Sequence, residues 1–287
     1  MRSSYSTTDL ARMLEVNEST VKRWADSGHI DCIRTKGGHR RFPVGAVLRF
    51  AQENKLALPA FDPAVLTDID LHAHVVAGNI GKLIPDLKRE ALAGNTDGLL
   101  RILRVGLAAR PDLLHLYHEL VFPPLVEVGD AWAAGRLSVD EEHLASHTVK
   151  DAVARLQPEV HVRPQRGRTL VAACAEDDLH DLALRCAANY FESEGWHVVF
   201  LGQSTPTDSL VHAIQTHHPH LVIVSVVVCA DERRFVRGMN EKVVPLVHGL
   251  GARLDIGGAN VRTRFGKRVK ADSFTESIIE YGPMAHV

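Results

Sequence analysis

The chain has 287 residues, a formal net charge of −2, 45% hydrophobic residues and 24% charged residues. These are ordinary values for a globular protein of two or three domains, at roughly 100–200 residues each. They exclude a disordered chain, a collagen-like repeat and a disulfide-stapled miniprotein. The longest apolar run, residues 221–230, is too short to cross a bilayer, and the first residues lack the apolar core of a signal peptide. The cysteines form no close pair, which indicates neither a zinc site nor a disulfide framework, and a reducing cytoplasm is the expected location.

Charge is distributed unevenly along the chain. Residues 1–50 contain nine Lys and Arg residues against five acidic residues, whereas the remainder carries 24 basic and 30 acidic residues. A small basic module on an acidic body is typical of a protein that contacts a polyanion at one end.

Two short helices are predicted in the basic module. Ser6 can cap the first helix, and Asp9, three residues later, can complete a capping box. A tight turn at residues 16–17 leads to a second helix that begins near Glu18 and is followed by Gly28, a typical C-cap residue. This pattern predicts a helix-turn-helix, whose second helix can enter the major groove of DNA.

A basic hairpin follows, with a strand predicted over residues 30–33 and a hairpin tip at residues 37–38. Trp24 and Phe42 are interpreted as core residues, because so small a domain needs large apolar side chains. Residues 10–42 closely resemble the winged helix-turn-helix of MerR-type regulators. The resemblance implies that DNA is contacted by residues of the second helix and the wing: Ser19, Thr20, Lys22, Arg23, His39, Arg40 and Arg41.

The domains expected after the DNA-binding module of residues 1–55 are a linker over residues 56–77 and a helical domain over residues 78–160. His72 and His74 in the linker are interpreted as solvated side chains, because no further metal ligands lie near them in the sequence. Apolar spacings of three and four residues predict an up-and-down bundle of four helices, over residues 78–93, 96–109, 112–134 and 138–157. The pair Pro123 and Pro124 is expected to kink the third helix, and Ser138 to cap the fourth.

Strands alternate with helices in the last region, residues 166–287. Strands are predicted at residues 169–174, 196–202, 221–228 and 253–258, and helices at residues 181–194, 206–218 and 231–250. This alternation indicates a doubly wound, Rossmann-like parallel sheet. The fold class is therefore multidomain α and α/β, with a ligand expected at the carboxyl ends of the strands.

Asp178 and His180 lie on the loop after the first of these strands, where a carboxylate can orient a metal-binding imidazole. Together with glycines and a serine after the later strands, this pattern resembles the cobalamin-binding domain of methionine synthase and its relatives. The resemblance implies that His180 is the lower axial cobalt ligand and that Asp178 orients it. It also implies that Ser225, Gly257 and Gly258 contact the benzimidazole tail, with Gly202 as a further cofactor-binding residue. Two departures from the family pattern are Ala183, in place of glycine, and Val227, in place of leucine. The methyl group of Ala183 is expected to crowd the tail and weaken binding.

Trp132 in the helical domain is followed ten and eleven residues later by Glu142 and His143. A buried tryptophan and a salt-bridged helix start would explain these residues structurally. With the three domains in this order, however, they resemble the cap of CarH/LitR-type light-responsive repressors, which implies that they contact an adenosyl group above cobalt. Photoreceptor members carry a histidine directly after the tryptophan, as the upper ligand after illumination. Here that position is Ala133, which leaves His143 or His147, water or a different upper ligand.

The combined resemblance implies a transcriptional regulator and repressor rather than an enzyme, with adenosylcobalamin or another cobalamin as cofactor. Its expected partners are a double-stranded DNA operator and further copies of itself, in a dimer or tetramer, and no membrane. Loss of the adenosyl group in light is expected to shift the cap and change assembly on DNA.

Three alternatives remain open from the sequence. The first is a corrinoid- or redox-sensing regulator without photochemistry. Cys229, at the end of a predicted core strand, could contribute a thiol to it, although a buried, inert cysteine is the favoured interpretation. The second is a corrinoid methyl-carrier protein, against which the DNA-binding module argues. The third is a cap that holds another pigment or haem through His115 and His118.

Overall fold

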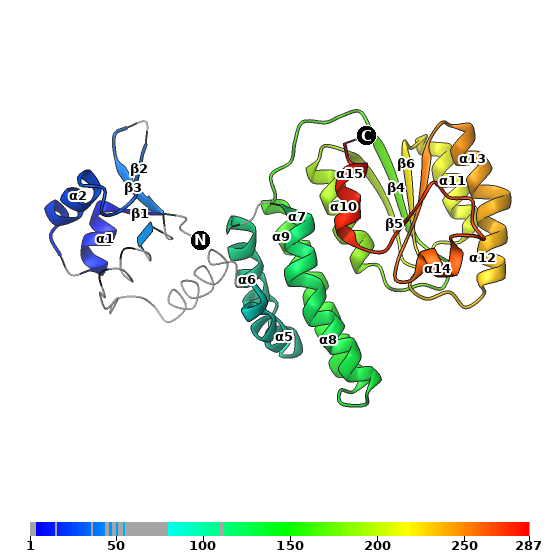
Figure 1. The fold of residues 1–287 in the computed structure, drawn as a ribbon, viewed down its shortest axis with the longest axis horizontal. Helices are drawn as coiled ribbons and strands as arrows, with labels where there is room; N and C mark the ends of the chain where they lie inside the picture. The colour runs from blue at the N-terminus through cyan, green and yellow to red at the C-terminus, as the bar shows by residue number, and fades with distance from the viewer. Residues whose placement is uncertain are drawn as a thin grey trace.

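The computed structural model describes residues 4–14, 16–35, 37–43, 46–47, 50, 54, 80–109 and 112–286. Figure 1 shows the arrangement of its helices and strands. The predicted linker, with His72 and His74, lies outside the described residues. Among the described residues, no helix is both long enough and apolar enough to cross a membrane.

The N-terminal region forms a helix-turn-helix with a small antiparallel sheet of order β1-β3-β2. Its elements are β1 (Ser4–Ser6), α1 (Thr7–Met13), α2 (Glu18–Asp26), β2 (Ile33–Arg34) and β3 (Arg40–Pro43). The predicted capping box is present, because Ser6 accepts the backbone N–H of Asp9 and the Asp9 carboxylate accepts the backbone N–H of Ser6. The strand predicted over residues 30–33 is largely wrong. The backbone N–H of Ile30 bonds to the Trp24 carbonyl at the end of α2, which holds Ile30 in a turn.

Apolar side chains from both helices and from the wing form one hydrophobic core in this module. Phe42 is fully buried, and Trp24 is a half-buried residue that packs against the same core cluster, with its ring tilted against that of Phe50 and the centroids 4.7 Å apart. The interpretation of Phe42 as a core residue is confirmed, whereas Trp24 lies at the margin of the core.

Helices packed side by side form a bundle in the middle of the chain (Figure 1). Its elements are a 3-10 turn (Ile80–Leu83), α5 (Ile84–Leu92), α6 (Thr96–Ala109), α7 (Leu113–Leu116), a π-helical turn (Tyr117–Val121), α8 (Phe122–Ala133), α9 (Val139–Leu156) and a 3-10 turn (Gln157–Glu159). The third predicted helix is thus divided by the π-helical turn directly before Pro123 and Pro124, whose missing N–H groups cannot bond to the preceding turn. Ser138 caps α9 in a capping box with Glu141.

A parallel sheet of order β5-β4-β6-β7-β8 forms the C-terminal region. Its strands are β4 (Thr169–Cys174), β5 (His197–Gly202), β6 (Leu221–Ser225), β7 (Arg253–Gly257) and β8 (Ser273–Thr275). The helices are α10 (Leu182–Ser193), α11 (Thr207–His217), α12 (Glu232–Gly238), a π-helical segment (Met239–Val243), α13 (Val244–Gly249), α14 (Val261–Phe265), a 3-10 turn (Ile278–Glu280) and α15 (Tyr281–Met284). The predicted strand 221–228 ends early, at Ser225, because the backbone N–H of Val227 bonds to the Asp178 carboxylate instead of continuing the ladder.

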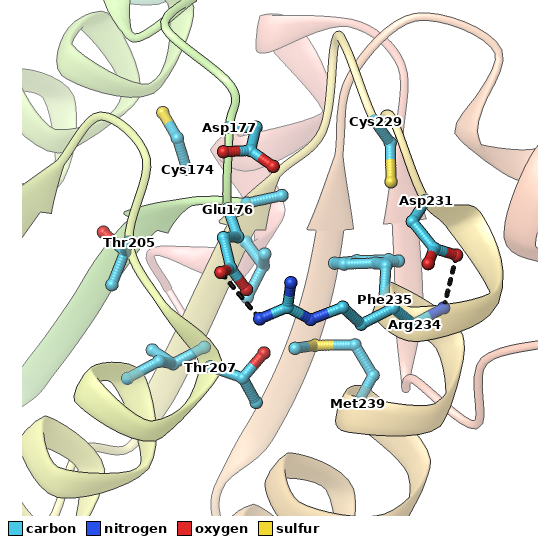
Figure 2. Close-up of a pocket in the computed structure, with 13 residues that line it drawn as sticks. Cys174, Glu176, Asp177, Thr205, Thr207, Cys229, Asp231, Arg234, Phe235 and Met239 are labelled. Atoms are coloured by element: carbon cyan, nitrogen blue, oxygen red, sulfur yellow. Dashed lines mark hydrogen bonds and ion pairs between the residues drawn. The ribbon is translucent and has the colours of Figure 1, made fainter.

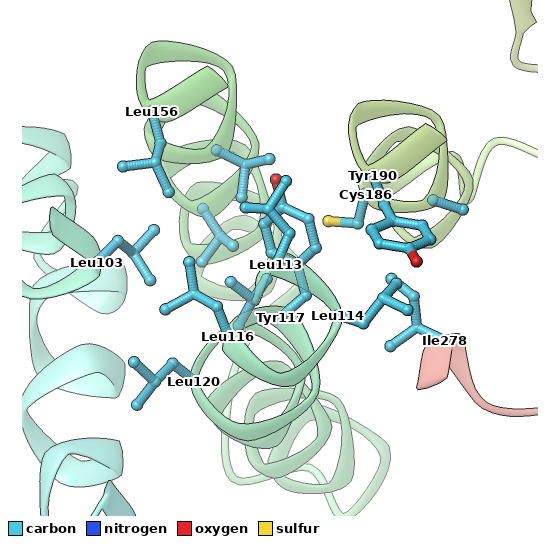
Figure 3. Close-up of a cluster of buried hydrophobic side chains, with 14 of the residues drawn as sticks. Leu103, Leu113, Leu114, Leu116, Tyr117, Leu120, Leu156, Cys186, Tyr190 and Ile278 are labelled. Carbon is cyan, nitrogen blue, oxygen red and sulfur yellow. The ribbon is translucent and has the colours of Figure 1, made fainter. Parts of the chain in front are cut away.

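The bundle and one face of the sheet share a single hydrophobic core. Alternate residues of β4 and β6, among them Leu170 and Ile223, face this core, while their neighbours face α11 to α14 on the other side. Figure 3 shows Leu113, Leu114 and Tyr117 between the two parts of this core, with leucines of α6 and α9 on one side and Cys186, Tyr190 and Ile278 on the other. The bundle is therefore held in a defined position beside the sheet.

Candidate functional site

One buried carboxylate organises the loop between β4 and α10. Asp178 is fully buried, and its Oδ1 accepts hydrogen bonds from Nδ1 (2.9 Å) and the backbone N–H (3.0 Å) of His180. Its Oδ2 accepts the backbone N–H of Val227 at 2.6 Å. Such donors offset the hydration that a carboxylate loses on burial. Asp178 therefore both orients His180 and connects the loop after β4 to the loop after β6.

The imidazole of His180 is presented to the outside. Its side chain is 61% exposed, and Nδ1 must be protonated, because an ionised carboxylate can only accept a hydrogen bond. The lone pair of Nε2 is then free to bind a metal. The described parts of the chain contain no group of three or more His, Cys, Asp and Glu side chains arranged to hold a metal ion. A metal at His180 must therefore bring its other ligands with it, as a corrin does.

The loop after β5 supports the same edge. The hydroxyl of Ser204 accepts the backbone N–H of Asp177 at 3.1 Å, and the backbone N–H of Ser204 donates to the Asp178 carbonyl at 2.9 Å. Asp177 and Ser204 both have positive φ, of 67° and 44°, a region that non-glycine residues rarely adopt. Gln203 donates to the Leu179 carbonyl at 2.7 Å. The loops after β4, β5 and β6 thus form one connected surface.

This surface exposes large apolar side chains around His180. Leu179 is 61% exposed, Val228 46% and Val227 37%. A group of such side chains at a ligand-binding edge indicates a surface that an apolar ligand covers. Ala183, where the cobalamin-binding family has glycine, is also exposed, in the first turn of α10. The expected crowding by its methyl group stays a prediction.

A row of small side chains runs across the sheet below this surface. Cys174 pairs with Ser225, Ser225 with Gly257, and Gly257 with Thr275, so all four lie on the face toward α10 and α15. Gly258 follows with φ of 138°, and a Cβ there would lie 2.5 Å from the Val226 carbonyl oxygen. Gly202 ends β5 with positive φ. This row suits the entry of a flat group between the sheet and its helices, so the residues present fit a corrinoid with a nucleotide tail.

The end of the bundle nearest the α8–α9 turn exposes the residues predicted to face an upper ligand. Trp132, in the last turn of α8, is 47% exposed, which excludes the explanation that it is a core tryptophan. The His143 side chain is 67% exposed and lies 3.7 Å from the half-buried carboxylate of Glu142. His147, one turn later, and Ala133 are also exposed.

An ion pair that the sequence did not predict connects α9 to the His180 loop. Lys150 Nζ lies 2.8 Å from the carboxylate of Asp181, the residue after His180. His147 and His143 share the Lys150 face of α9, about 4.5 and 10 Å further along the helix axis. In Figure 1 the α8–α9 turn lies at the bottom of the view, well below α14, the helix that follows β7. The spacing in the sequence predicts that the two histidines and Lys150 share one helix face. It does not predict the ion pair, because Asp181 lies 31 positions after Lys150.

A pocket lies on the other side of the β4–α10 loop, between α11 and α12. Figure 2 shows Glu176 and Arg234 joined in an ion pair of 2.8 Å across it, with Cys174 and Cys229 also in its lining. Burial raises the pKa of the Cys174 thiol to about 12 and also raises the pKa of Cys229, so both remain neutral thiols. Cys229 was predicted to end a core strand, which is wrong, because β6 ends at Ser225.

The N-terminal module presents its basic side chains on α2 and the wing. Exposed positions are Ser19, Lys22, Arg23, His39 and Arg41, whereas Thr20 is half-buried. Arg40 is also half-buried and pairs with the Asp26 carboxylate, which Arg34 approaches to 3.4 Å. Arg40, one of the predicted DNA contacts, therefore forms an ion pair within the module that connects the wing to the end of α2.

Comparisons with known proteins agree with this architecture. A helix-turn-helix domain model matches residues 4–55, and two models described as B12 binding domains match residues 83–157 and 168–263. The structure of the Methanosarcina barkeri monomethylamine corrinoid protein covers 70% of this chain and 95% of its own, with a TM-score of 0.60 and 19% identity. At that identity the likeness concerns the fold alone.

Two curated proteins of Myxococcus xanthus are more similar in sequence. The HTH-type transcriptional repressor CarH is 34% identical over 158 residues, which is 55% of this chain and about half (51%) of CarH. The HTH-type transcriptional repressor CarA is 30% identical over 261 residues, which is 85% of this chain and 86% of CarA. The protein therefore belongs to the family of HTH-type transcriptional repressors with B12-binding domains that includes CarA and CarH.

Proposed function

We propose that this protein is a cobalamin-dependent transcriptional repressor that senses light through adenosylcobalamin. The observation that carries the proposal is the Asp178–His180 pair at the sheet edge, with Nε2 of His180 free, in a chain that also has a winged helix-turn-helix. The proposed domains are the DNA-binding module (residues 1–55), the linker (56–77), the cap (78–160) and the cobalamin domain (166–287).

His180 would hold cobalt from below, and Gly202, Ser225, Gly257 and Gly258 would line the nucleotide tail. Adenosylcobalamin supplies a cobalt–carbon bond that light can cleave. Trp132, Glu142 and His143 would contact the upper group from the cap. His143 and His147 lie on one face of α9 and are the candidates for an upper cobalt ligand where Ala133 cannot serve.

The Lys150–Asp181 ion pair supports a coupling between the two sides, because it joins the cap to the residue beside His180. A cap that moves when its upper contacts are lost would alter the surface through which copies of the chain associate. Several helix-turn-helix modules bound together hold an operator far more tightly than one, so assembly controls DNA affinity. DNA would be contacted by exposed residues of α2 and the wing: Ser19, Lys22, Arg23, His39 and Arg41, with Thr20 and Arg40 beside them.

A second candidate is a corrinoid-sensing regulator without photochemistry. Ala133 favours it, because alanine offers no ligand where photoreceptor members have histidine. A redox version that relies on Cys229 is less favoured, since burial keeps that thiol neutral.

The test is an absorption spectrum of the full chain reconstituted with adenosylcobalamin in darkness and again after green illumination, with size-exclusion runs on both samples. We expect a histidine-ligated spectrum in the dark and a change of spectrum and assembly state in light. A bound corrin that ignores light would favour the second candidate, and absence of binding would exclude both.

A further inference from the structure

Tyr281, at the start of the C-terminal helix α15, is buried against the sheet beside the row of small residues. Its ring meets Phe191 of α10 edge to face, with centroids 6.0 Å apart. Its hydroxyl donates to Oδ2 of Asp255 at 3.3 Å. A buried tyrosine hydroxyl needs such a partner, so this bond fixes where the ring lies.

Asp255 is fully buried on β7, two residues before Gly257 and therefore on the same face. Its Oδ1 accepts the hydroxyls of Ser273 (2.6 Å) and Thr275 (2.9 Å), while Tyr281 bonds to Oδ2. Burial raises the pKa of Asp255, although the three hydroxyl donors act against this shift. The carboxyl group is thus anchored on one side by β8 and bonded on the other to Tyr281.

The Tyr281 hydroxyl occupies the space that Gly257 leaves open. A Cβ built on Gly257 would lie only 2.5 Å from this hydroxyl oxygen. Tyr281 therefore touches the bare Cα of Gly257, within the row that also contains Ser225 and Thr275. Any flat group that enters beside Gly257 must first displace the hydroxyl.

We infer that Tyr281 closes the nucleotide-tail channel of the empty protein and sets the cost of admitting that tail. This inference rests on the proposed function, because it takes the row beside Gly257 as the place of the tail. Entry of the tail breaks the bond between the Tyr281 hydroxyl and Asp255, which leaves Oδ2 without that donor. The cost falls on corrinoids that carry a nucleotide tail and not on those that lack it, so Tyr281 acts as a specificity residue.

The variant Tyr281→Phe tests this in the full chain. Phenylalanine keeps the ring against Phe191 but removes the hydroxyl beside Gly257. Dissociation constants are measured in darkness by absorbance titration with adenosylcobalamin and with adenosylcobinamide, which lacks the nucleotide tail. We expect the variant to bind adenosylcobalamin about five- to tenfold more tightly than the wild type, the factor that roughly one net hydrogen bond represents, and to bind adenosylcobinamide unchanged.

Tyr190→Phe is the matched control, since Tyr190 is also buried and meets Phe191 edge to face at 5.8 Å, but from α10. Its affinities for both corrinoids should equal those of the wild type, and thermal unfolding checks that all three proteins fold. Equal or weaker binding of adenosylcobalamin by Tyr281→Phe overturns the inference, as does a gain of the same size for adenosylcobinamide. In those cases a wild type that binds both corrinoids leaves the proposed function intact, whereas a wild type that binds neither overturns both.

Discussion

The sheet edge and the exposed end of the bundle are built in opposite ways. At the sheet edge, Asp178 is fully buried and its carboxylate accepts hydrogen bonds from His180 and Val227. At the end of the bundle, Trp132 is 47% exposed and the side chain of His143 is 67% exposed. Hydrogen bonds within the protein therefore fix the sheet edge, which is the proposed lower side of the cofactor site, whereas the end of the bundle, the proposed upper side, leaves its side chains exposed. Under the proposed function, preorganisation of this kind would place most of the binding energy at the sheet edge and leave the cap free to respond.

The largest expected effect follows from His180→Ala, which removes the proposed lower ligand. We expect the affinity for adenosylcobalamin to fall by at least about 100-fold, more than the loss of a residue that only orients a metal ligand. The spectrum of any residual complex should lose the signature of histidine ligation. His212→Ala, at an exposed position of α11, is the control and should bind as the wild type does. An unchanged spectrum in His180→Ala would contradict the assignment of His180 as the cobalt ligand, and with it the contrast between the sheet edge and the end of the bundle.

Asp178→Ala tests whether the lower side is organised by this carboxylate. The substitution leaves the donors of His180 and Val227 without their acceptor, and we expect a loss of about 3 kcal/mol in the free energy of unfolding. Cobalamin affinity should fall about 10- to 100-fold, because His180 is no longer oriented. Denaturant unfolding and absorbance titration measure the two quantities. Asp208→Ala, which removes an exposed ion pair with Lys242, should cost less than about 1 kcal/mol and leave binding intact.

Trp132→Ala tests the end of the bundle, where we expect a loss of cofactor affinity with almost no loss of stability. An exposed side chain contributes little to folding, so the free energy of unfolding should change by less than about 0.5 kcal/mol. Affinity for adenosylcobalamin should fall about tenfold, because the indole would lose its contact with the adenosyl group. Aquocobalamin, which carries only water above cobalt, should bind to the variant and the wild type equally. An equal loss for both ligands would contradict the assignment of Trp132 to the upper face.

The sequence was informative where the signal is local. Buried apolar runs predicted β4, β5 and β7 to within a residue, and the pair Asp178 and His180 was visible because its members lie two positions apart. The strand predicted over residues 221–228 was too long for an instructive reason. Val227 and Val228 are apolar, but they leave the sheet and face the open edge. Hydropathy alone cannot distinguish a residue covered by protein from one that a ligand would cover.

Contacts between distant segments were not predictable. Asp255 and Tyr281 meet across 26 positions, and β8, with its three residues, is too short to give a periodic signal. Lys150 and Asp181 are joined because α9 lies beside the start of α10. The Arg40–Asp26 pair likewise depends on how the wing folds against α2. Each of these contacts arises from the tertiary arrangement, for which one sequence carries no direct pattern.

The smallest expected effect concerns the connection between the two sides. Lys150→Met keeps the aliphatic length of the side chain but removes the ion pair with Asp181. In that pair the Lys150 side chain is 29% exposed and the Asp181 side chain 23%. We expect a loss of about 1 kcal/mol in the free energy of unfolding, toward the upper end for surface ion pairs because this one is partly buried. A double-mutant cycle with Asp181→Asn measures the pairwise part of that loss, and the exposed pair Lys242–Asp208 serves as the control.

The same pair of variants bears on signalling as well as stability. If Lys150 carries the state of the His180 loop into α9, Lys150→Met should bind adenosylcobalamin within about twofold of the wild type, since neither the proposed cobalt ligand His180 nor the Asp178 carboxylate that orients it is touched. The change of assembly state between dark and light, measured by size exclusion, should nevertheless become smaller. A full change of assembly in the variant would show that the two sides communicate through the bound ligand itself, with the ion pair contributing only to the packing of α9 beside α10.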